Sequence, residues 1–474
     1  MFDNALFQQL VDDKHPTGEV VGSDRFLVYV KGLDGVASGA LVVFENGERG
    51  MVRDITEETV LVMNLESENT PLGSLAVLHD NIVNTGVGEG LIGRVISPLC
   101  QPLDGKGPVK LTATWPIYNQ APGMMERELL KDRLSSGVTI VDLLFPVVLG
   151  QRIAILGDTK SGKSSFLQQL GINQAGTDRV VIYVLIGKRR VEIDQLVTRL
   201  NESGAIKNSI VIVADIFASL AQSYIAPYVG CAIGEYLWHS GRDVVLIYDD
   251  LSSHAKVYRE VALLSGSNPG RDSYPGDMFF AHSSLLERAG KLAKNGKTMT
   301  ALPVVITPGD DITAFLPTSI MSITDGQLIF DLATFRQNIK PAINAGLSVS
   351  RVGGRALNAR EKLLSGLLFK KLASYRQATE FAHFGSDLTP ETQAALLLGQ
   401  MINDSFRQGT GELWSPVEQQ LMLETVLTSA GQRKLNIGLL KLKVRELAPT
   451  VKNEADLDPI VAKLVEETTV GASV

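Results

Sequence analysis

The architecture of this chain follows from the residues Arg152-Ile153-Ala154-Ile155-Leu156-Gly157-Asp158-Thr159-Lys160-Ser161-Gly162-Lys163-Ser164, where a short apolar run leads into a glycine-rich loop. The apolar run predicts a buried strand ending at Leu156, and a helix is expected from about Lys163. In such a unit, glycines let backbone N–H groups turn toward phosphate oxygens, and the helix N-terminus adds positive potential. We therefore expect residues 157–164 to bind a nucleotide, with Lys163 at its β- and γ-phosphates and Ser164 as a ligand of Mg²⁺. The alternative is a glycine-rich turn that binds nothing.

The segments on either side of this loop predict an α/β domain. Apolar runs alternate with helical stretches, which is typical of a parallel sheet covered by helices on both faces. The further strands are expected at 180–186, 210–214 and 244–248, and the helices at 191–200 and 217–226. The last of these strands ends in Asp249, which would contact Mg²⁺, usually through water. A helix cap or turn is the alternative role, and Asp250 could exchange roles with Asp249.

Two further regions flank the α/β part. Short β-rich runs at 26–30, 40–44 and 60–63 are separated by glycine-containing turns, which predicts a small sandwich or barrel. The glycine-rich residues 84–90 look like a boundary, and after about residue 355 the strand pattern gives way to helical periodicity at 359–378 and 390–407. At about 150 residues per domain the chain should hold about three domains. We expect them at 1–86, 87–355 and 356–474.

The composition of the 474-residue chain excludes several classes of protein. Hydrophobic residues make up 45% and charged residues 20%, which rules out long disorder, collagen and a bare coiled coil. The net charge of −7 disfavours nucleic acid as a partner. Two cysteines and six scattered histidines cannot form a disulfide scaffold or a cysteine-rich metal site. The apolar runs are too interrupted to span a bilayer, and no signal peptide is evident, so we expect a reducing compartment.

Several longer motifs resemble the alpha subunits of F-type ATP synthases. They are 247–252 (IYDDLS), 269–277 (PGRDSYPGD), 284–289 (SLLERA), 322–327 (SITDGQ), 341–353 (PAINAGLSVSRVG) and 384–388 (FGSDL). The likeness extends over nearly the whole chain. It implies an N-terminal β-barrel, a central RecA-like nucleotide-binding domain and a C-terminal helical bundle, with ATP or ADP and Mg²⁺ as ligands.

The resemblance also implies that catalysis takes place in a neighbouring subunit and that this chain contributes to it. The position of the family's catalytic glutamate holds Lys188, a cation that cannot act as a carboxylate base, and the nearby Glu192 looks poorly placed in the following helix. A solvated surface lysine is the plain alternative for Lys188. Arg351 matches the family's arginine finger, which would act in trans on the catalytic site of a neighbouring beta subunit. An ordinary interface arginine is the alternative for Arg351.

Contacts to the base are carried over from the same resemblance. Phe335 and Pro341 match positions near the adenine, Lys340 stands where the family usually has arginine, and Gln408 resembles a glutamine near the base. Phe335 and Pro341 could equally be core residues. The chain departs from the family at Ile306, where glutamate is usual, and in the short segment before the barrel, which could alter attachment to the stator.

The implied assembly is a ring in which this chain alternates with beta subunits around a gamma central stalk. Delta and b-type stator subunits would be further partners, nucleic acid would not, and the membrane would be reached through other subunits. We expect ATP synthesis or hydrolysis coupled to ion transport at the cytoplasmic face of a bacterial inner membrane. A mitochondrial or plastid membrane is the alternative location. The competing functions are an alpha-like paralogue in a non-synthase machine and a self-sufficient hexameric P-loop ATPase.

Overall fold

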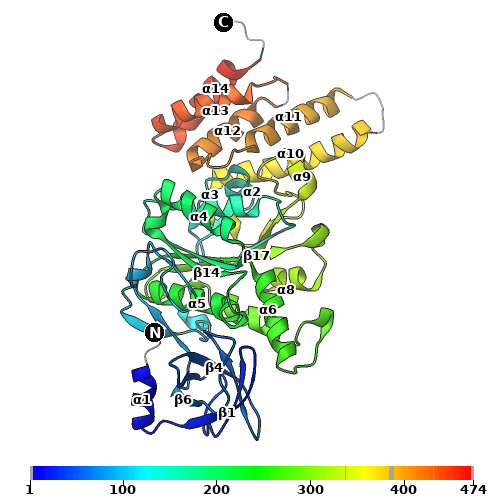
Figure 1. Cartoon of the computed structure of the whole chain (residues 1–474). Coiled ribbons are helices and arrows are strands. Elements are labelled where there is room, and N and C mark those ends of the chain that lie inside the picture. The colour runs from blue at the N-terminus through cyan, green and yellow to red at the C-terminus, as the bar shows by residue number, and fades with distance from the viewer. Residues whose placement is uncertain (1–3, 337, 384–388, 431, 471–474) are drawn as a thin grey trace. The chain divides into compact units, whose positions relative to one another are not determined.

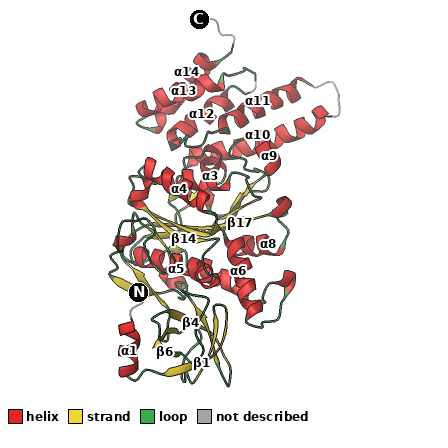
Figure 2. Ribbon diagram, viewed as in Figure 1, coloured by secondary structure: helices red, strands yellow, loops and turns green. Residues whose placement is uncertain are grey.

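A computed structural model of the chain describes residues 4–336, 338–383, 389–430 and 432–470. It divides into two compact units between which the chain passes several times. The first unit comprises Met1–Leu129, Gln174–Ile306 and Thr313–Thr324, and the second comprises Leu130–Asn173, Thr307–Ile312 and Asp325–Val474. The predicted fold class is confirmed: an N-terminal six-stranded barrel, a mixed, largely parallel sheet and a C-terminal helical region are all present (Figures 1 and 2).

The barrel in the first unit closes through antiparallel pairs in the order β1-β2-β5-β4-β3-β6. Its strands are β1 (Thr17–Asp24), β2 (Leu27–Lys31), β3 (Leu41–Phe44), β4 (Arg49–Ile55), β5 (Val60–Asn64) and β6 (Leu75–Asp80). Valines dominate the core cluster within it, as expected where β-branched side chains fill a small pleated interior. A short helix, α1 (Asn4–Asp12), packs Phe7 and Leu10 against Val43 and Val77.

The parallel strands of the first unit run in the order β17-β15-β13-β14-β8. They are β17 (Thr298–Ile306), β15 (Val244–Asp249), β13 (Val180–Lys188), β14 (Ser209–Asp215) and β8 (Val95–Ile96), with β16 (Gly290–Lys291) antiparallel to β17. Helix α4 (Arg190–Glu202) covers one face, and α5 (Leu220–His239) and α6 (Leu251–Leu264) cover the other (Figure 1). Burial on both faces explains the continuous apolar runs.

The glycine-rich residues 84–90, which look like a boundary in the sequence, contain β7 (Asn84–Val87), which pairs with β9 (Ala113–Pro116). The helix expected to end at residue 226 continues through Pro227 to His239, because nearly all of its side chains are buried and tertiary packing outweighs the cost of proline. The remaining helices of this unit are α7 (Met278–Leu286) and α8 (Phe315–Ile323).

In the second unit, β12 (Ala154–Gly157) pairs in parallel with β18 (Gly326–Phe330), and β19 (Val349–Ser350) lies antiparallel to β18. A small antiparallel pair joins β10 (Arg133–Leu134) to β11 (Val147–Val148). The helices are α2 (Thr139–Leu144), α3 (Lys163–Ile172), α9 (Leu332–Arg336), α10 (Ala359–His383), α11 (Pro390–Phe406), α12 (Pro416–Thr428), α13 (Ile437–Leu447) and α14 (Leu457–Thr468). Side chains of Thr389, Ser415 and Asn436 cap α11, α12 and α13.

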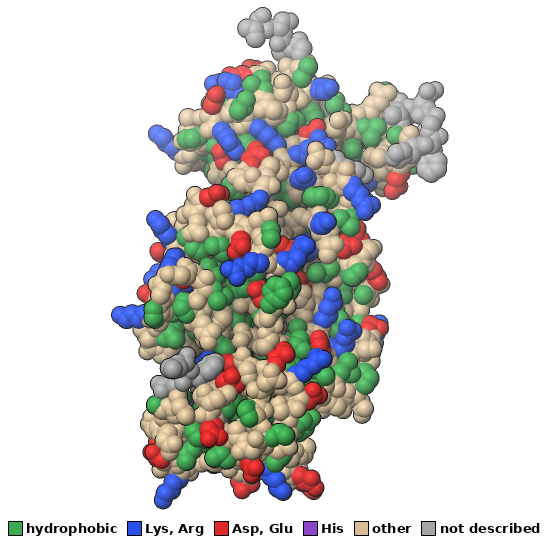
Figure 3. All heavy atoms as spheres, in the orientation of Figure 1, with side chains coloured by type: hydrophobic (Ala, Val, Ile, Leu, Met, Phe, Trp, Pro, Cys, Tyr) green, Lys and Arg blue, Asp and Glu red, His purple; other side chains and the backbone are tan. Residues whose placement is uncertain are grey.

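Within the described residues, no helix has both the length and the apolar character needed to cross a membrane. On the face seen in Figure 3, lysine and arginine side chains are interspersed with aspartate and glutamate side chains.

Candidate functional site

The phosphate loop has the local structure predicted from the sequence. Strand β12 ends at Gly157, and α3 begins at Lys163 directly after Gly162, which has a φ of 101°. Gly157 has a φ of 151°, and a Cβ there would lie 2.5 Å from the carbonyl oxygen of Phe330. Only glycine fits at that position, because the side chain of any other residue would push β12 away from β18.

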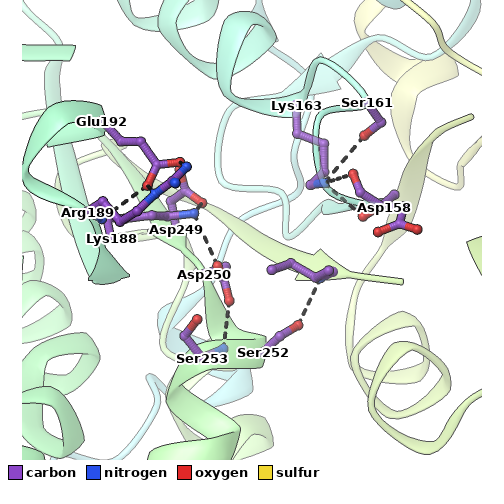
Figure 4. A network of polar contacts seen from close by, with 12 residues as sticks. Asp158, Ser161, Lys163, Lys188, Arg189, Glu192, Asp249, Asp250, Ser252 and Ser253 are labelled. Atoms are coloured by element: carbon purple, nitrogen blue, oxygen red, sulfur yellow. Dashed lines mark hydrogen bonds and ion pairs between the residues drawn. The ribbon is translucent and has the colours of Figure 1, made fainter. Parts of the chain in front are cut away.

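Lys163 lies folded over this loop (Figure 4). Its ammonium donates to the carbonyl oxygens of Gly157 at 2.8 Å and Asp158 at 2.7 Å. The Asp158 carboxylate accepts from the backbone N–H groups of Gly309 and Thr159, and these bonds lower the pKa of Asp158. The loop therefore presents a lysine held among backbone carbonyls, which phosphate oxygens could replace as acceptors.

Three of the residues expected near the base lie together beside the phosphate loop. The Phe335 ring is 3.6 Å from the position that a Cβ on Gly162 would take. The Lys340 ammonium is 5.0 Å from the centre of the Phe335 ring, within range of a cation–π interaction. The carbonyl oxygen of Lys340 accepts from the backbone N–H of Gln408, at 2.8 Å. Phe335 thus lies beside Gly162, Lys340 lies beside Phe335, and Gln408 is bonded to the backbone of Lys340, while their contacts with a base stay a prediction.

The Gln408 side chain is fully engaged with the backbone. Its Oε1 accepts from the N–H of Thr139 at 2.6 Å, and its Nε2 donates to the carbonyls of Gly137 and Glu412, both at 2.9 Å. Only 5% of Gln408 is exposed. The amide therefore fastens the loop after α11 to the segment before α2, and a contact between Gln408 and the base stays a prediction.

In the first unit, β15 ends in Asp249 and is followed by Asp250, at the edge where β13 also ends. The register places Leu185 of β13 beside Asp249, so Lys188 lies at the same edge. The Lys188 ammonium is 2.6 Å from Oδ1 of Asp249 and 3.1 Å from Oδ2 of Asp250 (Figure 4). Asp250 also caps α6 by accepting from the N–H of Ser253 at 2.6 Å. A cation thus bridges both carboxylates.

Lys188 is held in its charged form by this arrangement. Burial alone would lower the pKa of Lys188, but the charges of Asp249 and Asp250 outweigh burial and raise it above its usual value. The interpretation of Lys188 as a solvated surface lysine is therefore wrong, since only 18% of its side chain is exposed. Sequence reasoning found Lys188 and Asp249 separately but missed that they are partners.

The Glu192 side chain is bonded to Arg189, the residue before α4, and Glu192 itself lies in this helix as the sequence predicts. Its carboxylate accepts from the backbone N–H of Arg189 at 3.1 Å and pairs with the guanidinium of the same residue. The bond from the Arg189 side chain lowers the pKa of Glu192. A carboxylate held in this way is a poor base.

In this arrangement, Oδ1 of Asp249 is not available as a direct ligand of a divalent metal ion. Mg²⁺ prefers oxygen ligands at about 2.0–2.1 Å, but the Oδ1 atom of Asp249 already faces an ammonium group. Across the described residues, no group of three or more histidine, cysteine, aspartate or glutamate side chains is arranged to hold a metal. Ser164 is exposed at the start of α3. Mg²⁺ at Ser164 and Asp249 stays a prediction from the phosphate-loop motif and from the strand that ends in Asp249.

Arg351 follows β19 in the second unit, and its side chain is exposed. Its backbone N–H donates to the carbonyl of Asp325 at 3.0 Å. The Asp325 carboxylate is in turn fixed by the Arg152 guanidinium, at 2.9 Å. The backbone beneath Arg351 is therefore anchored, while its guanidinium lies at the surface.

Comparisons with known proteins agree over both units. The family model for the ATP synthase alpha/beta family, nucleotide-binding domain, matches residues 137–350. The model for the ATP synthase alpha/beta chain, C terminal domain, matches residues 360–467. One curated relative is the ATP synthase subunit alpha of Caldanaerobacter subterraneus subsp. tengcongensis. It is 38% identical over 460 residues, which cover 95% of this chain and 91% of the relative.

Proposed function

This chain belongs to the ATP synthase alpha/beta family, on the alpha side of it, and from this premise we propose that it binds ATP or ADP without hydrolysing it. The observation that carries the proposal is Lys188. Hydrolysis needs a group that orients and deprotonates water, and the family resemblance places that group at position 188. A lysine that bridges Asp249 and Asp250 cannot accept a proton, and Glu192 is tied to Arg189.

The nucleotide would be held by the loop 157–164. Backbone N–H groups and Lys163 would bind the phosphates, and Ser164 lies where the family binds Mg²⁺. Phe335, Lys340, Pro341 and Gln408 would surround the base. Phe335 and Lys340 already lie beside Gly162 and each other, which supports this assignment.

Arg351 would serve a neighbouring subunit. Its exposed guanidinium on an anchored backbone suits an arginine finger, which stabilises the charge that develops on the transferred phosphoryl group. In this proposal the chain alternates with beta subunits in a hexameric ring around a gamma stalk. Delta and b-type stator subunits hold the ring, and the complex couples ATP synthesis or hydrolysis to ion transport at the cytoplasmic face of a membrane.

Reconstitution with a beta partner tests the proposal. The purified chain should bind ATP but show no turnover, and the mixture should hydrolyse ATP. Arg351→Ala should lower the turnover of the mixture by about 10³–10⁵-fold, whereas Arg355→Ala, an exposed arginine nearby, should leave it within about twofold. Appreciable turnover by the isolated chain, together with a harmless Arg351→Ala, would show that the proposal is wrong. It would favour the self-sufficient hexameric ATPase instead.

A further inference from the structure

We propose that a cavity in the first unit binds an aliphatic diamine or polyamine. The cavity lies beside helix α4 and the carboxyl end of β14, which are labelled in Figure 1, and its volume is about 680 Å³. Small-molecule sites usually measure about 300–1,000 Å³, so the cavity is large enough for such a ligand. Its lining lies wholly within the first unit, whereas the phosphate loop belongs to the second. The site is therefore additional to the nucleotide site of the proposed function.

Apolar side chains form much of the cavity wall. They come from helix α4 (Ile193 and Val197), from β14 (Val213), from the turn after β14 (Phe217) and from the segment after β8 (Leu103). Phe217 is 83% exposed, so its ring offers apolar surface that a ligand would cover. Burial of one methylene group tightens binding about fourfold. This wall therefore favours a ligand with an aliphatic chain.

Carboxylates outnumber cationic side chains around the cavity. The lining contains Glu66, Glu68, Asp104, Asp194 and Asp215, against Lys106 and Arg190. Asp104 is paired with Arg94 and Asp194 with Arg190, so these two carboxylates already have counterions. Glu68 and Asp215 form no ion pair within the part of the chain that the structure describes. Two negative charges are thus left for the ammonium groups of a ligand.

Glu66 adds a buried carboxylate with an unused acceptor. Its side chain is only 6% exposed, and its Oε1 accepts from the guanidinium of Arg49 at 2.7 Å. Its Oε2 is buried and has no hydrogen-bond partner among the described residues. A buried carboxylate oxygen without a donor is unfavourable, because it has lost water and gained nothing in return. An ammonium group bound at this end of the cavity would supply the missing donor.

The cationic side chains of the lining do not favour an anion instead. The Lys106 ammonium donates to the carbonyl oxygen of Gly93 at 3.0 Å, and the Arg190 side chain is 76% exposed beside Asp194. A bare metal ion would gain nothing from the apolar wall, and the described residues hold no group of three or more side chains arranged to bind one. A chain of methylene groups that carries ammonium groups matches both the apolar wall and the carboxylates.

Hydrogen bonds within the first unit hold the lining in place. The Arg94 guanidinium donates to both carboxylate oxygens of Asp104, at 2.7 and 2.9 Å, which fixes the segment after β8. The side-chain amide of Gln222 on α5 donates to the carbonyl of Leu65, next to Glu66, at 3.1 Å. Asp215 accepts from the backbone N–H of Phe217 at 2.9 Å, which fixes the turn after β14. A ligand would therefore enter a preformed site, which lowers the cost of binding.

Calorimetric titration of the purified full-length chain with two diamines, without nucleotide and at about 150 mM salt, tests the inference. The probes are diaminobutane and diaminooctane, which differ only in the length of the methylene chain. We expect saturable binding at one site, with a dissociation constant for diaminooctane below about 0.1 mM. Diaminooctane should bind at least about tenfold more tightly than diaminobutane, because its extra methylene groups contact the apolar wall. Equal affinities, or binding that does not saturate, would overturn the inference.

Three variants show whether the ligand lies in the cavity. Asp215→Asn keeps an oxygen for the Phe217 N–H but removes the charge, so it should weaken diaminooctane binding about tenfold. Val197→Trp fills the cavity without changing any charge and should abolish binding. Glu58→Gln, the control, removes an exposed charge from the barrel and should stay within about twofold of the natural chain.

Two results with these variants would contradict the proposed site. If Glu58→Gln weakened binding as much as Asp215→Asn, the diamine would be attracted only by the net negative charge of the chain. Normal binding by Val197→Trp would place the ligand outside the cavity. Thermal melts of each variant establish that it is folded, and Asp215→Asn tests the site even where the larger Val197→Trp change prevents folding.

Discussion

Replacing Arg288 by methionine should destabilise the first unit more than any change at its surface. Arg288 and Glu235 are both about 2% exposed and form a two-point pair, Nε to Oε1 at 2.7 Å and Nη2 to Oε2 at 2.6 Å. The third guanidinium nitrogen donates to the carbonyl of Ile117. The Glu235 carboxylate also accepts from Trp115 at 3.0 Å and Asn119 at 3.3 Å.

The magnitude follows from what Arg288→Met leaves behind. Glu235 keeps only two neutral donors for a buried charge, and the carbonyl of Ile117 loses this donor. Breaking one side of a buried pair typically costs about 3–5 kcal/mol. Adding Glu235→Gln removes the charge but keeps an oxygen for Trp115, so the double variant should regain about 2 kcal/mol.

Urea unfolding followed by tryptophan fluorescence measures these differences. Two of the three tryptophans, Trp115 and Trp238, lie in the first unit, so the signal mainly reports that unit. Arg242→Leu is the matched control, because its pair with Glu89 is 37% and 61% exposed and should be worth less than about 1 kcal/mol. A double variant as unstable as Arg288→Met alone would refute the reasoning, since the cost could not then come from an uncompensated charge.

Three further predictions concern the protonation of two buried histidines, the hydrogen bonds of Gln408 and the phosphate loop. Burial lowers the pKa of His254 to about 4 and that of His282 to about 3, so the unfolded chain binds these protons more readily. Thermal melts should therefore show stability falling as the pH drops from about 6.5 toward 4, and His254→Gln should flatten this dependence; identical slopes would contradict it. Gln408→Ala leaves three buried backbone groups without their Gln408 partner, so chemical denaturation should show a free energy of unfolding about 2–3 kcal/mol lower for the second unit. A decrease under about 0.5 kcal/mol would show that these hydrogen bonds do not stabilise the unit. Gly157→Ala should abolish ADP binding in calorimetry through its collision with Phe330, whereas Gly366→Ala, whose Cβ meets no atom within 4 Å, should not; normal binding by Gly157→Ala would count against a phosphate site there.

The fold was predictable where the sequence pattern is local. The runs expected at 180–186, 210–214 and 244–248 became β13, β14 and β15 with ends shifted by at most two residues, because strands buried on both faces need unbroken apolar side chains. The glycines of segment 84–90 suggested a domain boundary, which stays a prediction, and gave no sign of the strand β7. A Cβ on Gly86 would lie 2.4 Å from Leu111, so this glycine serves close packing against a segment remote in sequence. Our boundaries at 86/87 and 355/356 remain proposals.

The candidate site likewise has one part that a local sequence motif predicts and another that depends on contacts between residues distant in the sequence. The phosphate loop is a continuous motif whose glycine and lysine roles follow from eight neighbouring residues, so the sequence predicts its local shape. The partners of Lys188 depend on how β13 and β15 are aligned, and the 60 residues between Lys188 and Asp249 say nothing about that register. The bonds of Gln408 to residues 137–139 are equally remote in sequence. Charge at a sheet edge is predictable only once the strand order is known.

The role of Lys188 depends on Asp249 and Asp250, the two carboxylates with which it forms ion pairs. Asp249 and Asp250 are adjacent and largely buried, and two neighbouring carboxylates in such a place need a cation or must take up a proton. In a site that holds a divalent ion, the metal can supply that charge, which leaves a nearby position free to carry a catalytic carboxylate. Here the lysine supplies it. A carboxylate at 188 would therefore face two others without a counterion, so the cation at this position follows from the charge balance of the strand edge.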